Sequence, residues 1–324
     1  MRPVSTRTSF CSRANSRNGK VIQHIEEHGQ NRRCLFFLDQ YGYKDIPFND
    51  IRMIFSRLPR AEIILTFSTD AAINYISTLD DDPRWRKPFE SLGLPKERID
   101  KMQEEKQENK DWRQLIQFGL HQDICLQSGA KFYTPFFIAS EKSNRSYWLV
   151  HLSNHEKARD VMTELHWGLK NYFSHYGGPG LWMFGYDPMK DTGITGQHEL
   201  FGETEYSFDE AAKERTQHAI IEQLPKLIYE FPDGIRYLEL YRRVANTTPA
   251  TSEHIKEIAA LLLEAKELEA RGPNNEHRRS RIEKNDILRY PRQTTLFGNF
   301  GLSDIIRSRD GKKICRRNYS FLKR

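Results

Sequence analysis

The chain has 324 residues, of which 38% are hydrophobic and 29% are charged, and its formal net charge is +6. No window approaches the roughly 18 consecutive apolar residues of a membrane-spanning helix, and the basic N-terminus lacks the apolar segment of a secretory signal. We therefore expect neither an integral membrane protein nor a secreted precursor. The four cysteines are scattered without a C-x-x-C pair, which favours reduced thiols in the cytoplasm and no metal site.

The positive charge is concentrated at the two ends of the chain. Residues 1–33 hold seven Lys or Arg and two acids, residues 271–324 hold fifteen and five, and the intervening residues 34–270 have a balance of −9. This distribution predicts that the ends, including a basic N-terminal arm at 1–33, make any contact with DNA or RNA. A solvated tail that only aids solubility is the alternative.

The segments after this arm alternate between strand-like and helix-like patterns. Residues 34–38, CLFFL, form a continuous apolar run, which is typical of a strand buried on both faces in a parallel sheet. Residues 46–58 have helical spacing, residues 61–67 form a second β-branched run, and residues 70–79 predict a helix behind an Asp cap. The short turns between these segments predict a parallel α/β layer.

The α/β domain is expected to extend over residues 34–173. We interpret the highly charged residues 80–112 as an insertion over the sheet, either a lid or a solvated helix. Residues 131–139 and 146–153 flank a polar turn and predict an antiparallel hairpin. The amphipathic helix expected over residues 155–173 carries the apolar side chains of Val161, Met162, Leu165, Trp167 and Leu169.

A second domain is expected over residues 210–297, after a glycine-rich linker at 174–209. It shows three helical patterns followed by an alternating, turn-rich segment. Together these patterns predict a winged helix-turn-helix with a two-stranded wing and with the helix near 251–269 in the recognition position. Residues 298–324 form a basic tail.

The predicted wing carries a cluster of cations, and phosphate contacts are usual on a wing. We assign nucleic-acid contacts to six residues: Arg278, Arg279, Arg281, Lys284, Arg289 and Arg292. A winged helix that binds protein is the alternative. The third helix is acidic at its exposed positions, which disfavours base contacts along its length and favours contact by the wing or none.

The stretch FFLDQYGY, residues 36–43, places Asp39, Tyr41 and Gly42 directly after the first predicted strand. Open α/β sheets bind their ligands at the carboxyl ends of their strands. An acceptor oxygen that holds an exocyclic amino group, followed by an aromatic ring that stacks on a flipped-out base, suits an amino-methyltransferase. The usual Asp/Asn-Pro-Pro-Tyr/Phe motif has two prolines where this chain has only Gln40. A plain strand-end turn, with Asp39 capping a backbone N–H and Tyr41 packing under the next helix, is the alternative.

Over residues 20–297 the order of elements resembles the three-Cys-motif partner (TcmP) family. The similarity rests on the Asp-x-Tyr-Gly turn followed by Ile-Pro and on the SNH sequence after the second hairpin strand. The resemblance implies a class I S-adenosylmethionine-dependent methyltransferase sheet of order 3-2-1-4-5-7-6, in which this chain supplies strands four to seven. It also implies a radical-SAM-like three-cysteine protein as partner in bacteria or phages, and it matches Asp70 to the acid after strand five.

The chain departs from this family in its first half. Only 34 residues precede Leu35, and they contain neither a glycine loop like FAGPG nor a strand that ends in an acid for the ribose hydroxyls. We therefore expect an N-terminally truncated member that has no cofactor-binding residues, binds no S-adenosylmethionine and transfers no methyl group by itself. Whether it is an enzyme is left open, as is its oligomeric state. The alternative function is a winged-helix component of a two-gene system that binds nucleic acid or protein.

Overall fold

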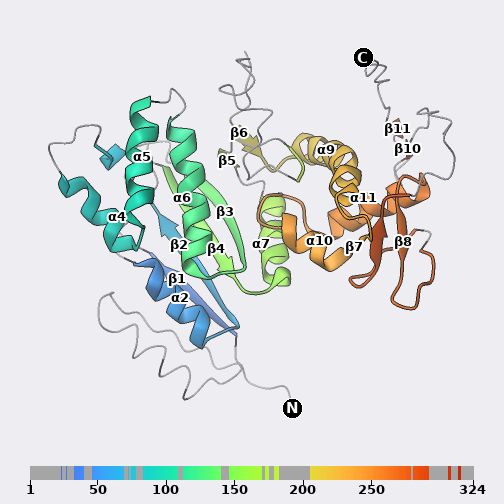
Figure 1. Cartoon of the computed structure of the whole chain (residues 1–324), viewed down its shortest axis with the longest axis horizontal. Helices are drawn as coiled ribbons and strands as arrows, with labels where there is room; N and C mark the ends of the chain where they lie inside the picture. The colour runs from blue at the N-terminus through green and yellow to red at the C-terminus, as the bar shows by residue number, and fades with distance from the viewer. Residues whose placement is uncertain are drawn as a thin grey trace. The chain divides into compact units, whose positions relative to one another are not determined.

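The structure is a computed structural model divided into two compact units, which are described separately (Figure 1). The first comprises Met1–Gly178, Trp182–Ala212 and Ala245–Thr247, and the second comprises Pro179–Leu181, Lys213–Val244 and Thr248–Arg324. The described residues are 23, 27, 33–39, 46–68, 72, 74–77, 83–108, 112–139, 146–169, 172–174, 179–181, 205–278, 280–291, 306–307 and 313–314. Among them, no helix is both long and apolar enough to cross a membrane.

The first unit is built on a four-stranded sheet of order β1-β2-β4-β3. Strand β1 (Cys34–Leu38) runs parallel to β2 (Ala61–Phe67), whereas β4 (Ser146–Ser153) is antiparallel to both β2 and β3 (Phe132–Ala139). The two apolar runs therefore lie side by side, and the hairpin is reversed so that its second strand pairs with β2. This is the order expected for the last four strands of the sheet.

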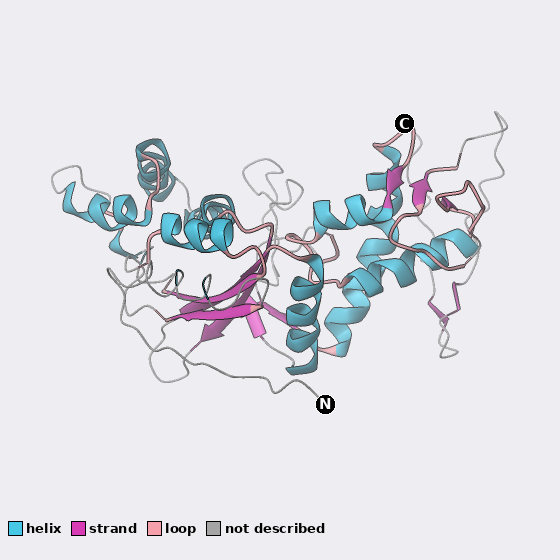
Figure 2. Ribbon diagram, turned by 90° about the horizontal axis from the view of Figure 1, so that it is seen from below, coloured by secondary structure: helices cyan, strands magenta, loops and turns pink. Residues whose placement is uncertain are grey.

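One face of the sheet carries the apolar core. Alternate residues of β2 on this face are fully buried, and the register places Val150 and Leu152 of β4 beside them. The face is covered by α2 (Phe48–Arg57) and α6 (Trp112–Ser128), which contribute Ile51 and Ile124 to the core. Figure 2 shows these helices together on one side of the sheet.

The charged segment expected to be a lid or a solvated helix is part of this core. It forms η1 (Pro83–Arg86), α4 (Lys87–Leu92) and α5 (Lys96–Glu108). Its apolar side chains at Phe89, Ile99 and Met102 are at most 1% exposed and belong to the core cluster. The expectation was wrong because the few apolar residues of each helix lie on one face, and one apolar face is sufficient to pack a helix against the core.

The opposite face of the sheet is open at β1. Leu35 pairs with Glu62 and Phe37 with Ile64 on this face, yet Leu35 is 52% exposed and Phe37 is 70% exposed. The expectation that β1 is buried on both faces was therefore wrong. The reason is that β1 is the edge strand of the described sheet, and no described helix covers this half of the second face.

Helix α7 (Glu156–Leu169) packs against β3 and β4, and its amphipathic character is the reverse of the usual one. Val161, Leu165 and Leu169, expected as part of an apolar face, are 53%, 50% and 62% exposed. The buried positions are instead polar: Glu156, Arg159, Asp160, Thr163 and His166. A physical reason lies in the strands, because the buried side chains of Thr134, His151 and Ser153 on β3 and β4 are polar as well.

The ends of the glycine-rich linker are strands that pair with each other. After α7, β5 (Tyr172–Ser174) pairs antiparallel with β6 (Glu205–Ser207). Most of the residues between these strands lie outside the described part of the chain.

The second unit has the elements of a winged helix. Its helices are α9 (Glu210–Tyr229, of which residues from Lys213 on belong to this unit), α10 (Tyr237–Val244) and α11 (Ser252–Glu264). Its sheet has three strands in the order β7-β9-β8, formed by β7 (Ile235–Arg236), β9 (Ile287–Arg289) and β8 (Glu269–Arg271). A short ladder of β10 (Ile306–Arg307) and β11 (Lys313–Ile314) follows.

Two details of this unit differ from the sequence expectation. The wing sheet has a third strand, β7, where two strands were expected, and α11 ends at Glu264 rather than near residue 269.

At the start of α11, the Thr251 side chain accepts a hydrogen bond from the His254 backbone N–H, and the His254 side chain completes a capping box. Gly234 before β7 has φ +84°, and a Cβ there would lie 2.8 Å from the carbonyl oxygen of Leu288. The turn into the wing sheet therefore needs glycine.

Candidate functional site

The predicted target-amine turn follows the carboxyl end of β1. The register pairs Leu38 with Leu65, so the parallel strands β1 and β2 end at the same edge of the sheet, and Asp39 is exposed there. An exposed carboxylate at this edge can accept a hydrogen bond from an amino group. Tyr41, Gly42 and Asp70 lie outside the described residues, so their part in the turn stays a prediction.

A cavity is lined by residues that follow β2 in the sequence. Its volume is 360 Å³, and Tyr75, Ser77, Arg84 and Trp85 line it. This volume is at the lower end of the range for small-molecule sites. Aromatic rings and a guanidinium suit an aromatic or anionic ligand, but these four side chains include no carboxylate or imidazole for acid–base chemistry.

The second face of the sheet contains a buried histidine held by a carboxylate. His151 is fully buried, and its Nε2 lies 3.0 Å from Glu62 Oε2 on the neighbouring strand. The hydrogen bond to His151 is the main cause that lowers the pKa of the Glu62 carboxyl. Thr134 is the cross-strand neighbour of His151, and neither its Oγ1 nor His151 Nδ1 has a hydrogen-bond partner among the described residues.

Sequence reasoning missed this pair. The structure places His151 inside β4 and His155 exposed just before α7, and the described residues include no group of three or more candidate metal ligands. A signal for the buried pair was available in β2, where Glu62 is the one charged residue of a mostly apolar strand.

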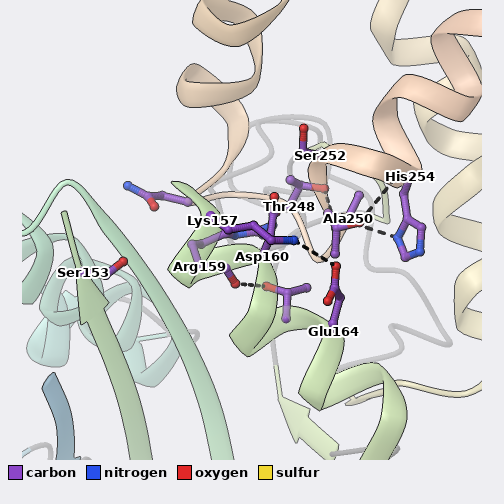
Figure 3. Close-up of polar contacts among 12 residues, drawn as sticks. Ser153, Lys157, Arg159, Asp160, Glu164, Thr248, Ala250, Ser252 and His254 are labelled. Carbon is purple, nitrogen blue, oxygen red and sulfur yellow. Dashed lines mark hydrogen bonds and ion pairs between the residues drawn. The ribbon is translucent and has the colours of Figure 1, made fainter. Parts of the chain in front are cut away.

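A second buried histidine lies on α7. His166 is 1% exposed and stacks on Phe208, with 5.4 Å between the ring centroids. Burial, followed by electrostatic interactions with Arg159 and His151, lowers its pKa from 6.5 to about 4. The buried imidazole is therefore neutral at physiological pH. On the exposed side of the same helix, Lys157 and Glu164 form an ion pair at 3.9 Å (Figure 3).

The predicted nucleic-acid residues of the wing are largely engaged with neighbouring groups. Arg278 donates two hydrogen bonds to the buried Asp286 carboxylate, at 2.9 and 3.0 Å, and this contact raises the pKa of the guanidinium. Arg281 forms an ion pair with Glu283 at 3.0 Å. These acids compensate much of the charge that the wing would present to phosphates.

The other predicted wing residues are distributed differently. Arg289 donates its Nε–H to the Asp233 carbonyl at 3.0 Å, and Lys284 is exposed. Arg279 and Arg292 lie outside the described residues. The exposed positions of α11 include Glu253, Glu257 and Glu264, as expected for a helix unsuited to base contacts.

Sequence reasoning also missed an aromatic surface on the second unit. We define it by Tyr229, Phe231, Arg243, Arg289 and Tyr290. The rings of Tyr229 and Tyr290 meet edge to face at 5.4 Å and are 70% and 47% exposed. The guanidinium of Arg243 lies 5.0 Å from the Phe231 ring centroid. The aromatic residues at and after the end of α9, Tyr229 and Phe231, were a signal in the sequence. Only the fold brings Tyr290, which follows β9, into contact with Tyr229.

Comparisons with known proteins bear on the winged helix. Residues 185–275 match the family model described as the GMT-like wHTH domain, a range that includes α9, β7, α10, α11 and β8. The chain therefore contains a winged helix-turn-helix domain. No curated protein and no solved structure matches the chain.

Proposed function

We propose that the protein is a winged-helix binding component of a bacterial or phage two-gene system, similar to the three-Cys-motif partners. In this proposal, its α/β unit corresponds to the target-amine half of a methyltransferase-like sheet and transfers no methyl group by itself. The observation that carries the proposal is the sheet order β1-β2-β4-β3, with a parallel pair followed by a reversed hairpin. The match of residues 185–275 to the GMT-like wHTH domain supports the winged-helix part of the proposal.

S-adenosylmethionine would be the methyl donor in such a system, and the described residues do not fit it. In an open α/β sheet the donor binds at the carboxyl ends of the strands, in a crevice between neighbouring strands. Strand β1 is the edge of the described sheet, so it has a described neighbour on one side only. Asp39 is the acid that the structure describes directly after β1, and we assign it to the target amine rather than to the donor.

The proposal predicts that the full chain does not bind S-adenosylmethionine. Isothermal titration calorimetry of residues 1–324 should show no heat of binding at micromolar ligand. Clear micromolar binding would overturn this part of the proposal. If such binding occurred, an unchanged affinity in Asp39→Asn would still place Asp39 away from the donor.

The partner half of the proposal has a separate test. Co-expression with the three-cysteine protein of the same genome should give a complex that elutes as one species in size-exclusion chromatography. Two separate peaks at micromolar concentration would contradict the two-gene interpretation, whatever the result with S-adenosylmethionine.

A second candidate function is binding of duplex DNA through the wing. Arg281 has a side chain that is 87% exposed and Lys284 is exposed, so both can reach phosphates despite the acids nearby. Each phosphate contact contributes about one unit to the slope of log K against log salt. The double variant Arg281→Gln, Lys284→Gln should therefore reduce that slope by about 2. An unchanged slope would remove the wing from the interface.

A further inference from the structure

We infer that the aromatic surface of the second unit, formed by Tyr229, Phe231, Arg243, Arg289 and Tyr290, binds single-stranded nucleic acid. This goes beyond the proposed function, because it names a surface and a class of partner that neither the methyltransferase-like sheet nor the wing cations require. Surfaces for single strands combine rings on which bases stack with cations that follow the backbone. Both kinds of group are present on this surface, which carries three aromatic rings and two arginines.

The two tyrosines supply the stacking groups. Tyr229 is the last residue of α9 and Tyr290 directly follows β9, so both rings are carried by regular elements. Their edge-to-face contact, with an interplanar angle of 87°, holds one ring against the other and leaves Tyr229 70% exposed. Large exposed rings that are held in one orientation lose little entropy when a base stacks on them.

Two arginines supply charge beside the rings. Arg289 is fixed by one hydrogen bond to the Asp233 carbonyl, a neutral acceptor, and forms no ion pair with another described residue. Arg243 lies over Phe231 and forms an ion pair with Glu239 at 3.4 Å, with both side chains more than half exposed. Such an exposed pair is weak and screened, so Arg243 can exchange its carboxylate for a phosphate.

The charge of the chain next to this surface favours a polyanion over a protein partner. Residues 292–324, which follow Tyr290 and Pro291, contain nine Lys or Arg and two acids, a balance of +7. A partner protein would meet the same rings, since Tyr and Arg are common in protein interfaces. A long basic segment that directly follows these residues in the sequence is more specific to a nucleic-acid backbone.

A single strand fits better than a duplex. Paired bases hide their faces in the stack, so exposed rings gain contacts only with unpaired bases. The elements that would enter a duplex groove or contact its phosphates are less suited, because α11 exposes three glutamates and Arg278 is held by the buried Asp286 carboxylate.

The test is fluorescence anisotropy of the full chain with labelled oligo-dT, oligo-rU and a duplex of equal length, at about 200 mM salt to suppress contacts made by charge alone. Tyr229→Ala should weaken oligo-dT or oligo-rU binding by about 5- to 100-fold, the range for loss of one stacked base. Tyr229→Phe, which keeps the ring, should stay within about twofold. Leu126→Ala, at an apolar side chain of the first unit that is 71% exposed, is the matched control and should bind like the wild type.

Three outcomes would overturn the inference. Equal binding by Tyr229→Ala and the wild type would remove the rings from the interface. Tighter binding of the duplex than of both single strands would point to the wing instead. No binding of any oligonucleotide would leave the rings for a protein partner. Circular dichroism of Tyr229→Ala that matches the wild type shows that a loss does not come from unfolding.

Discussion

Acid should destabilise the first unit through His166 before most carboxylates titrate. Its pKa is lowered from 6.5 to about 4, first by burial and then by electrostatic interactions with Arg159 and His151. Above pH 6.5 both the folded and the unfolded chain have a neutral imidazole, and no stability depends on it. Between these two pKa values only the unfolded chain binds the proton, so acidification favours unfolding.

The magnitude follows from the two pKa values. Each pH unit between them lowers the free energy of unfolding by about 1.4 kcal/mol, which amounts to about 3 kcal/mol for the whole interval. That is a large part of the 5–15 kcal/mol typical of a folded domain. The Glu62 carboxyl has a lowered pKa, so its stabilising contribution is lost only below its usual value of 4.5. The interval from 6.5 to 4.5 therefore separates the histidine from this carboxyl, and comparison with a variant at His166 separates it from the other groups.

The assay is urea unfolding followed by tryptophan emission at several pH values across this interval. All five tryptophans belong to the first unit, so emission follows that unit and not the winged helix. The His166→Gln variant should be less stable at neutral pH, because it loses the contact with Phe208, but its stability should change little with acidification. His155→Gln, at an exposed histidine before the same helix, should keep the wild-type pH dependence.

The comparison of slopes decides the result. If the wild type and His166→Gln lose the same free energy of unfolding between pH 6.5 and 4.5, His166 is not the source of the acid sensitivity. The same conclusion follows if the wild type shows no loss in this interval. A flat His155→Gln profile would point to the exposed histidine instead.

Three further predictions concern the packing within each unit and the exposed edge strand β1. Tyr237→Phe removes the hydroxyl that donates to the Ser252 carbonyl at 2.6 Å, and should cost the second unit about 1–2 kcal/mol by circular dichroism, while tryptophan emission stays unchanged. Leu165→Lys should change the stability of the first unit by less than about 0.5 kcal/mol, whereas Leu152→Ala should cost about 2–5 kcal/mol; similar costs would refute the reversed face of α7. Phe37→Lys should reduce self-association in light scattering without loss of stability, since an apolar edge strand favours association; equal scattering by both proteins would contradict this.

The local sequence patterns predicted most of the elements and their order. The apolar runs at 34–38 and 61–67 are strands, and the hairpin and the three helices of the winged domain are where the periodicity placed them. Such patterns depend on residues close in the chain, so they can be recognised without the fold. The winged helix was recognisable for the same reason, and the family-model match confirms it.

The candidate sites were less predictable because they depend on contacts between distant residues. Glu62 and His151 are 89 residues apart, and only the antiparallel pairing of β2 and β4 brings them within 3.0 Å. The wing cations lie close together in the sequence, but the pairing of Arg278 with Asp286 and of Arg281 with Glu283 depends on how the wing folds.

The amino-acid sequence by itself determined the order of strands and helices along the chain, the presence of a winged helix and the basic ends of the chain. The tertiary structure decided which face of each element is buried. Phe37 is exposed because β1 is an edge strand, and Leu165 is exposed because α7 packs its polar side against a polar part of the sheet. Periodicity shows that a helix or strand has two different faces, but the neighbouring elements decide which one water reaches.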